Sequence, residues 1–201
     1  MLKSSMVTNV ILIINGLIFA LWMVLPTDLM AQHFLVSMSG VASGKFWTLL
    51  TSVFSHNTVW HLLLNMFALR GFGQAVEGFI GPKRFLNLYL LTGLAGSLLH
   101  CLVSTYLLES PGLPALGASG AVCGIILFYS FSFPSRKILL LALIPVPAIW
   151  GSILLVGLDL WGLSYQAQGR GLPIGHGAHL GGALTGLLYY LWLKKKKLSH
   201  P

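Results

Sequence analysis

The sequence predicts an all-α, polytopic membrane protein, folded as one bundle of six transmembrane helices. The first observation is composition: of 201 residues, 56% are hydrophobic and only 8% are charged, a balance typical of chains that live in a bilayer. The second is a series of apolar runs of membrane-spanning length. The third is that Lys and Arg gather in alternate connections between those runs. The length predicts a single domain over residues 1–201.

Six apolar segments are long enough to cross a hydrocarbon core. The first contains too long an apolar stretch for a signal peptide and is therefore assigned as a spanning helix. The fifth contains Pro145 and Pro147, which remove backbone hydrogen bonds and are expected to kink or loosen its helix. The predicted spans, with boundaries good to a few residues, are 7–25, 59–79, 85–107, 116–133, 138–160 and 175–193.

The basic residues predict the orientation of the bundle. With six spans, most of them fall on one side, and only Lys45 and Arg170 lie in the opposite loops. By the positive-inside rule both termini are expected to be cytoplasmic. The net charge of +8 then requires no nucleic-acid partner, and the basic tail is expected to contact anionic lipid. The residues on the cytoplasmic side are Lys3, Lys83, Arg84, Arg136, Lys137 and Lys194–Lys197.

Polar side chains inside apolar spans are costly, so they indicate functional sites. His61 and Asn65 begin the second span, Ser119 begins the fourth, and His176 and His179 begin the sixth. All even-numbered spans start on the non-cytoplasmic side in this topology. The three sets should therefore lie at one depth near that surface.

The small residues around these polar groups favour close helix packing. Gly182 and Gly186 form a small-xxx-small pair after His179, and glycines also flank Ser119 at 117, 120 and 124. The fourth and sixth helices are thus expected to approach closely enough for the His179 ring to reach the Ser119 hydroxyl. A serine becomes a nucleophile when a base such as histidine takes its proton.

An acyl-transfer site also needs hydrogen-bond donors for the oxyanion. The candidates are the backbone N–H groups where the fourth helix starts, with Gly117 and Ala118 lining this region, together with the His61 ring and the Asn65 amide. The role of His176 stays open between substrate or water handling and structure. No cofactor is predicted. No metal is predicted either, because no H-E-x-x-H motif is present and no intramembrane carboxylate is expected near these histidines.

Three motifs together resemble the rhomboid family of intramembrane serine proteases: "GASG" (117–120), "HLLLN" (61–65) and "AHLGG" (178–182). The resemblance covers nearly the whole chain and implies a six-helix core. It implies that Ser119 is the nucleophile and His179 the base of a dyad, with His61, Asn65 and the Ser119 N–H as oxyanion donors. It also implies that residues 46–56 form a loop in the membrane interface.

The inventory of acids agrees with a dyad, because none of Asp28, Glu77, Glu109 and Asp159 is placed as an obvious third member. By the resemblance, the fifth span is a lateral gate and the substrates are single-span transmembrane proteins cleaved near the outer face. The alternative is a catalytically silent rhomboid-like protein that binds transmembrane clients. The short chain favours a bacterial plasma membrane over an organelle, and the oligomeric state is not predicted.

Overall fold

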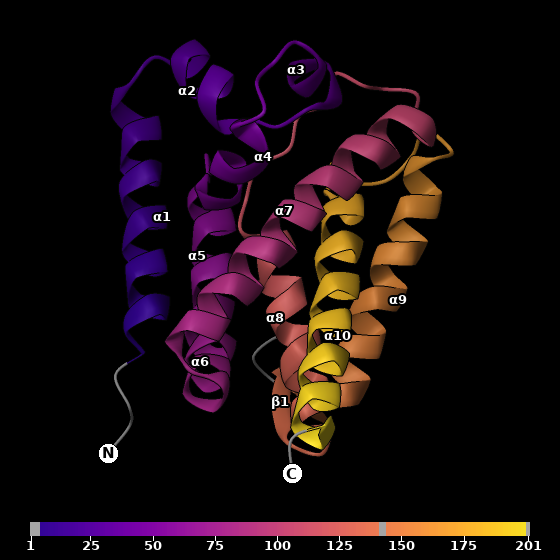
Figure 1. Ribbon diagram of the computed structural model, residues 1–201. Coiled ribbons are helices and arrows are strands. Elements are labelled where there is room, and N and C mark those ends of the chain that lie inside the picture. The colour runs from indigo at the N-terminus through magenta and orange to yellow at the C-terminus, as the bar shows by residue number, and fades with distance from the viewer. Residues whose placement is uncertain (1–4, 141–143, 200–201) are drawn as a thin grey trace.

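The structure, a computed structural model, describes residues 5–140 and 144–199. Long helices stand roughly side by side, and short helices cover one end of the bundle (Figure 1). The start of α1 (Met6–Val24) and the end of α10 (His176–Ser199) lie at the opposite end of the bundle. Lys3, one of the residues used to predict orientation, lies outside the described residues. The mainly helical fold agrees with the class that the sequence predicts.

Most long helices match the predicted spans closely. Three of them, α1, α7 and α9, have the length and hydropathy to cross a membrane. The second span is one continuous helical stretch with a π-helical turn in its middle. The bounds are α1 Met6–Val24, α5 Val59–Ala68, η2 Leu69–Gly73, α6 Gln74–Ile80, α7 Pro82–Tyr106, α8 Ser119–Ser132, α9 Ala148–Gln166 and α10 His176–Ser199.

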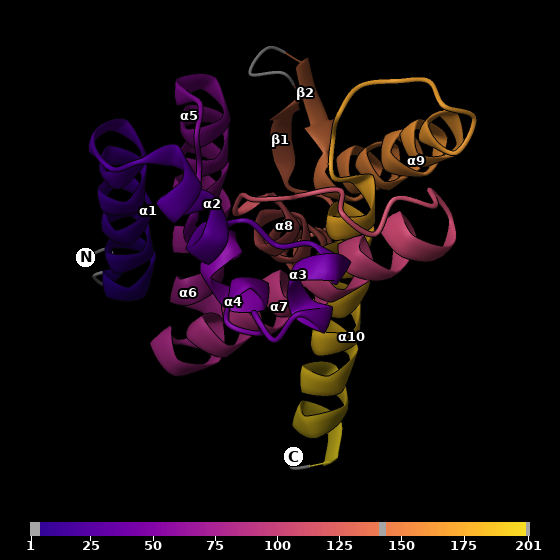
Figure 2. The ribbon, with the colours of Figure 1, turned by 90° about the horizontal axis from the view of Figure 1, so that it is seen from above.

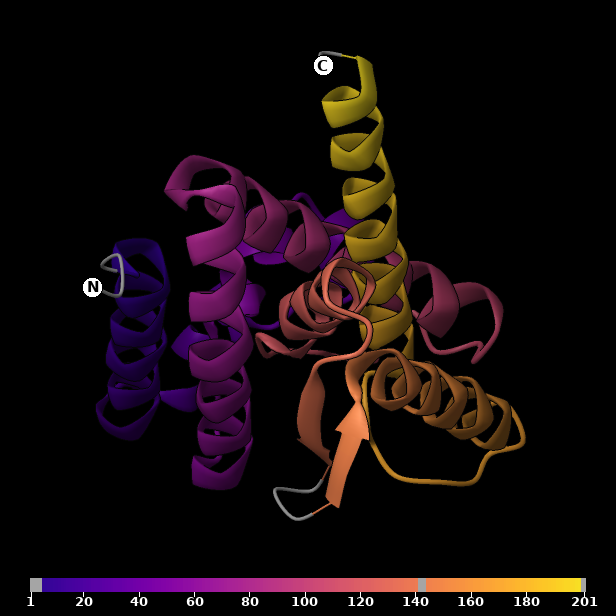
Figure 3. The ribbon, with the colours of Figure 1, turned by 90° about the horizontal axis from the view of Figure 1, so that it is seen from below.

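The predicted start of the fifth span is wrong. Instead of a helix from residue 138, the chain forms an antiparallel hairpin of β1 (Lys137–Leu140) and β2 (Ile144–Pro147), and α9 begins after Pro147. Pro145 and Pro147 do not kink a helix, because both precede it. Proline lacks an amide hydrogen and disfavours helical geometry in the residue before it, so the helix can start only beyond the pair. Figure 3 shows the hairpin projecting beside α8 and α9.

The helix α8 lies at the centre of the bundle (Figure 2). Ten of its 14 residues are buried, and its most extensive packing is against α10 and α7. A side chain at Gly182 or Gly186 would overlap the backbone carbonyl of Gly120 or Gly124. The backbones of α8 and α10 therefore touch, as the small-residue spacing predicts.

The connection between α1 and α5 folds into short helices over one end of the bundle (Figure 1). In this segment Phe46, Trp47 and Leu50 are exposed. Thr48, Ser52 and Val53 are buried. Large apolar side chains thus point outward, and small polar and apolar side chains point inward. The short helices are α2 Thr27–Phe34, α3 Met38–Ala42, α4 Thr48–Thr51 and η1 Ser52–Phe54.

Glu77 fastens α1 to the lower end of the second helical stretch. Its buried carboxylate accepts hydrogen bonds from the N–H groups of Val7 and Thr8 and from the Thr8 hydroxyl. The first N–H groups of a helix have no partner within it, so a carboxylate there caps the helix and complements its dipole. Glu77 therefore holds the start of α1.

Candidate active site

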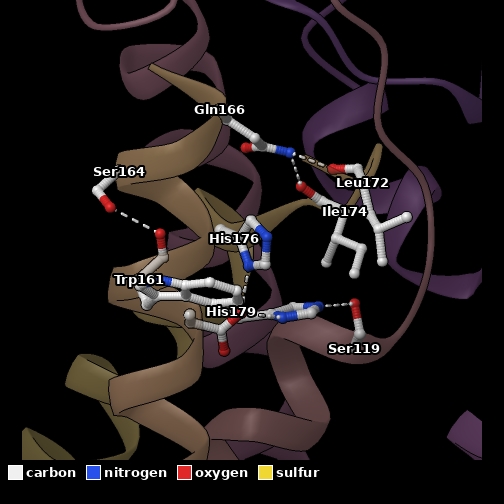
Figure 4. A network of polar contacts seen from close by, with 9 residues as sticks. Ser119, Trp161, Ser164, Gln166, Leu172, Ile174, His176 and His179 are labelled. Carbon is white, nitrogen blue, oxygen red and sulfur yellow. Dashed lines mark hydrogen bonds and ion pairs between the residues drawn. The ribbon is translucent and has the colours of Figure 1, made fainter. Parts of the chain in front are cut away.

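The side chains of Ser119 and His179 meet between α8 and α10. The Ser119 Oγ lies 2.8 Å from His179 Nε2, and both residues are only partly buried. Figure 4 shows the hydroxyl facing the imidazole ring. Ser119 is the first residue of α8, and His179 lies one turn into α10, which begins at His176. The contact that the sequence predicted between these two side chains is present.

A carboxylate lies on the other side of the His179 ring. Asp159 Oδ1 of α9 is 2.9 Å from His179 Nδ1 and 2.6 Å from His176 Nδ1. The expectation that no acid is placed as a third member was therefore wrong. Asp159 is 20 residues from His179 in sequence, and only the packing of α9 against α10 joins them. An aspartate in an apolar span is costly, and this cost is the signal that could have found it.

His176 belongs to the same hydrogen-bonded network. It is buried, and its Nδ1 contacts the Asp159 carboxylate. Figure 4 shows its ring beside that of His179, with the loop residues Leu172 and Ile174 on the far side. The Gln166 amide donates to the carbonyls of these two loop residues. The loop before α10 is thereby tied to the end of α9 next to the histidines.

The segment leading into Ser119 is held by the connection between α1 and α5. Ala115 exchanges two backbone hydrogen bonds with Val36, and the Gly117 N–H donates to the Ser52 carbonyl. The Ala118 N–H donates to His56 Nε2 over 3.4 Å. The amides of Gly117 and Ala118 thus already have acceptors, so they shape the approach to Ser119 and are not free oxyanion donors. Sequence reasoning missed this role of His56.

Gly117 has a φ of +124°, a conformation that glycine adopts readily. A Cβ at this position would lie 2.6 Å from the His61 ring. Any larger residue would therefore displace His61 from the serine segment. The Asn65 amide, which is mostly buried, donates to the His61 carbonyl one turn earlier on α5. The structure thus brings His61 next to Gly117. Asn65 lies one helical turn after His61 on α5 and hydrogen-bonds to its carbonyl.

Burial, together with a smaller effect of the neighbouring His61, lowers the pKa of His56 to about 3. A neutral ring can accept the Ala118 N–H at Nε2, whereas a protonated ring cannot. The low pKa therefore preserves the hydrogen bond that positions the serine segment.

One metal-binding arrangement must be weighed against these hydrogen bonds. Single ligand atoms of Cys123, Asp159 and His179 lie within 4.8 Å of one another, so the argument that no carboxylate lies near these histidines was wrong. Both His179 nitrogens nevertheless have hydrogen-bonding partners, Ser119 and Asp159. The absence of a metal remains a prediction that a chelator can test.

The fold and this site define a polytopic membrane protein in which a serine hydroxyl faces a histidine ring. Comparison with known proteins identifies its family. The family model described as "Rhomboid domain" matches residues 43–196. This chain belongs to the rhomboid family.

Named relatives come from organelles and from bacteria. The chain is similar to RHOMBOID-like protein 12, mitochondrial, of Arabidopsis thaliana, at 33% identity over 92% of this chain and 57% of that protein. It is also similar to Rhomboid protein 1, mitochondrial, of Saccharomyces cerevisiae, at 33% identity over 90% of this chain and 51% of that protein. The chain therefore spans about half the length of these relatives.

Rhomboid protease GluP of Bacillus subtilis shares 40% identity over 42% of this chain and 15% of its own length. These relatives do not support the preference for a bacterial plasma membrane, because mitochondrial proteins stand among them.

Proposed function

We propose that this protein is an intramembrane serine endopeptidase that cleaves transmembrane-segment substrates near the non-cytoplasmic face. The observation that carries the proposal is the 2.8 Å contact between Ser119 Oγ and His179 Nε2 at the meeting of two apolar helices. An imidazole nitrogen that can accept the hydroxyl proton is the arrangement that activates a serine as a nucleophile. Family membership supports the same reading, since the family includes a protein named as a rhomboid protease.

The chemistry follows from the two side chains. His179 Nε2 takes the proton of Ser119 as Oγ attacks the carbonyl carbon of the scissile peptide. The new C–O bond gives a tetrahedral intermediate with a negative oxygen. His179 then returns the proton to the nitrogen of the leaving amine as the C–N bond breaks. Water, activated in turn by His179, hydrolyses the acyl-enzyme and restores Ser119.

The oxyanion requires donors that are already in place. We assign this role to His61, to the Asn65 amide and to the N–H of Ser119 in the first turn of α8, where backbone donors lack helical acceptors. The positive end of the α8 dipole points to the same place. The partial exposure of Ser119 and His179 supports access for water from that end of the bundle.

The expected substrates are single-span membrane proteins. A peptide bond within a helix is shielded by its own hydrogen bonds, so the cleaved segment must unwind, and small or helix-breaking residues lower that cost. The expected location is an integral, multi-pass position in a lipid membrane with both termini cytoplasmic. No nucleic acid and no cofactor enter the proposal.

A fluorophosphonate probe on the detergent-solubilised protein tests the proposal. Wild type should be labelled, Ser119→Ala should not, and Ser135→Ala, which changes an exposed serine in the connection after α8, should label like wild type. Labelling that persists in the presence of EDTA agrees with serine chemistry, whereas its loss would favour a metal site. Absence of labelling in folded wild type would favour the alternative, a rhomboid-like protein that only binds transmembrane clients.

A second experiment identifies the substrates. Cells that express wild type are compared with cells that express Ser119→Ala. Membrane-protein fragments released only by the first culture come from direct cleavage by this protein or from a downstream protease. Incubation of each purified candidate with the purified protein then separates the two. An identical fragment population in both cultures would contradict proteolysis.

A further inference from the structure

The Asp159 carboxylate is shared between two imidazoles. One of its oxygens, Oδ1, lies 2.9 Å from His179 Nδ1 and 2.6 Å from His176 Nδ1. A carboxylate only accepts hydrogen bonds, so each Nδ1 must carry the hydrogen. For a neutral His179 this leaves Nε2 with a free lone pair, 2.8 Å from the Ser119 hydroxyl. The contact with Asp159 thus selects the tautomer that a general base needs.

The carboxylate is well shielded from solvent, since Asp159 is 6% exposed and His176 is 8% exposed. A buried carboxylate is costly unless it is paired and hydrogen-bonded. His176 meets this requirement from the helix that also carries His179. A side chain at Gly162 of α9 would overlap the His176 ring, so glycine at this position lets the ring lie against α9.

Two further titratable groups face this network. Cys123 of α8 lies with its sulfur within 4.8 Å of ligand atoms of Asp159 and His179. His61 of α5 lies beside Gly117, two residues before Ser119. Neither of these two groups hydrogen-bonds to the Asp159 carboxylate, whereas both His176 and His179 do. The direct partners of Asp159 are therefore the two histidines of α10.

Resting on the proposed protease function, we propose that Asp159 is a positioning residue of this site, which orients His179 and stabilises its protonated form, and that His176 holds Asp159 in place. The site is then a hydrogen-bonded series of Ser119, His179 and Asp159. The second histidine, His176, hydrogen-bonds to the same carboxylate. This arrangement goes beyond the two-residue dyad that the resemblance implies.

The placement of Asp159 on α9 has a mechanical consequence. The serine and the base lie on α8 and α10, but the orienting carboxylate lies on a different helix, the one expected to act as a lateral gate. A displacement of α9 away from α10 would withdraw the carboxylate from both rings. The base is therefore fully oriented only when α9 packs against α10.

The test uses the full-length protein in detergent and measures fluorophosphonate labelling rates and cleavage of a transmembrane peptide across pH. Asp159→Asn should lower the turnover number by about 10²- to 10⁴-fold with little change in KM, because an amide no longer fixes the tautomer or stabilises the imidazolium. Asp159→Glu, which keeps the carboxylate, should retain more activity. His176→Asn should lose less than Asp159→Asn. Leu158→Ala, at an exposed neighbouring position on α9, should behave like wild type.

The pH dependence separates positioning from general loss of structure. Without the carboxylate, protonated His179 is less stable, so the fall in rate on the acid side should move to lower pH in whatever activity Asp159→Asn retains. Wild-type rates and an unshifted profile in a folded Asp159→Asn variant would overturn the inference. The protease proposal would survive that result, provided that Ser119→Ala abolishes labelling.

A variant that fails to fold does not leave the question open. Nitrogen NMR of histidine side chains in wild type reports the tautomer directly, and the expected state of His179 carries hydrogen on Nδ1. Finding it on Nε2 in the resting protein would overturn the proposal without any substitution.

Discussion

At the scale of single residues, His56 connects the segment between α1 and α5 to the serine. It is fully buried and accepts the Ala118 N–H at Nε2, immediately before the proposed nucleophile. Its other ring nitrogen is buried without a hydrogen-bond partner among the described residues. A buried polar atom left unpaired costs free energy. The buried His56 ring therefore lowers the folding stability through its unpaired nitrogen. This agrees with a role for the ring in holding the serine segment.

The pKa of His56 predicts a pH-dependent stability. It is lowered to about 3 by burial and by His61, whereas an unfolded histidine titrates near 6.5. Between these values the unfolded chain binds the extra proton, so stability falls as pH falls from about 6.5 toward 3. His56→Gln, which offers an acceptor but does not titrate, should flatten this part of the curve. The measurement is thermal unfolding in detergent at a series of pH values.

The control for this prediction is His33→Gln, which alters an exposed histidine of α2. It should follow the wild-type pH dependence. Parallel curves for wild type and His56→Gln would contradict the prediction, because His56 would then contribute nothing to the acid sensitivity.

The candidate site could be predicted only where the residues carry a local signal. Ser119 and His179 each stand among small residues at the start of a span, and their contact follows from the spacing of glycines on two helices. Asp159 lies deep in α9 with no motif around it. Its position depends on how α9 rotates and packs against α10, which one chain's sequence pattern does not determine. The pairing with His176 was missed for the same reason.

At the scale of elements, the helices begin and end close to the predicted bounds where an apolar run has clear ends, and they differ where prolines interrupt one. Residues 138–147 are as apolar as a helix in a membrane. Pro145 and Pro147, however, have no backbone N–H to donate and disfavour helical geometry in the residues that precede them. Ile138, Ile144 and Val146 suit a strand, and the segment forms the β1–β2 hairpin. Average hydropathy cannot distinguish these two outcomes, whereas the placement of proline can.

The contact between α8 and α10 gives a prediction about glycine. Gly182→Ala should destabilise the bundle by about 1–3 kcal/mol, because the added methyl group would overlap the Gly120 carbonyl where two backbones touch. Gly157→Ala, the same change on α9 at a position with open space around it, should be neutral or stabilise by about 0.5–1 kcal/mol through helix propensity. Thermal unfolding and fluorophosphonate labelling measure both variants.

Since Ser119 and His179 lie on these two helices, Gly182→Ala should also slow labelling. Equal stability of the two alanine variants would show that α8 and α10 are not in backbone contact in the membrane protein.

At the scale of the whole molecule, the two ends of the bundle differ in charge and chemistry. The start of α1, the ends of α6 and α10 and the strands β1 and β2 lie at one end, and the short helices lie at the other (Figure 1). Lys83 and Arg84 lie in the first turn of α7, just after the end of α6, and Arg136 and Lys137 lie at the start of the hairpin, so these residues belong to the first end. The serine and histidine lie toward the other end, where α8 and α10 begin. The candidate site and the basic residues are thus separated along the bundle.

This separation predicts the orientation in the membrane. Basic residues stay on the cytoplasmic side, so Ser135, in the connection before the hairpin, should face the cytosol. Ala167, just after α9, should face the opposite compartment. Both residues are exposed, and both native cysteines, Cys101 and Cys123, are buried. Ser135→Cys and Ala167→Cys should therefore react with a membrane-impermeant maleimide from opposite sides of sealed vesicles.

The vesicles provide their own control when they are prepared in both orientations. Inside-out vesicles should label Ser135→Cys and protect Ala167→Cys, and right-side-out vesicles should give the reverse. The unmodified chain sets the background from the buried thiols. Labelling of both introduced cysteines from one side would contradict the bundle as a membrane-spanning unit. A clean reversal would place Ser119 and His179 toward the cytosol, so the proposed substrates would have to be cleaved near the cytoplasmic face.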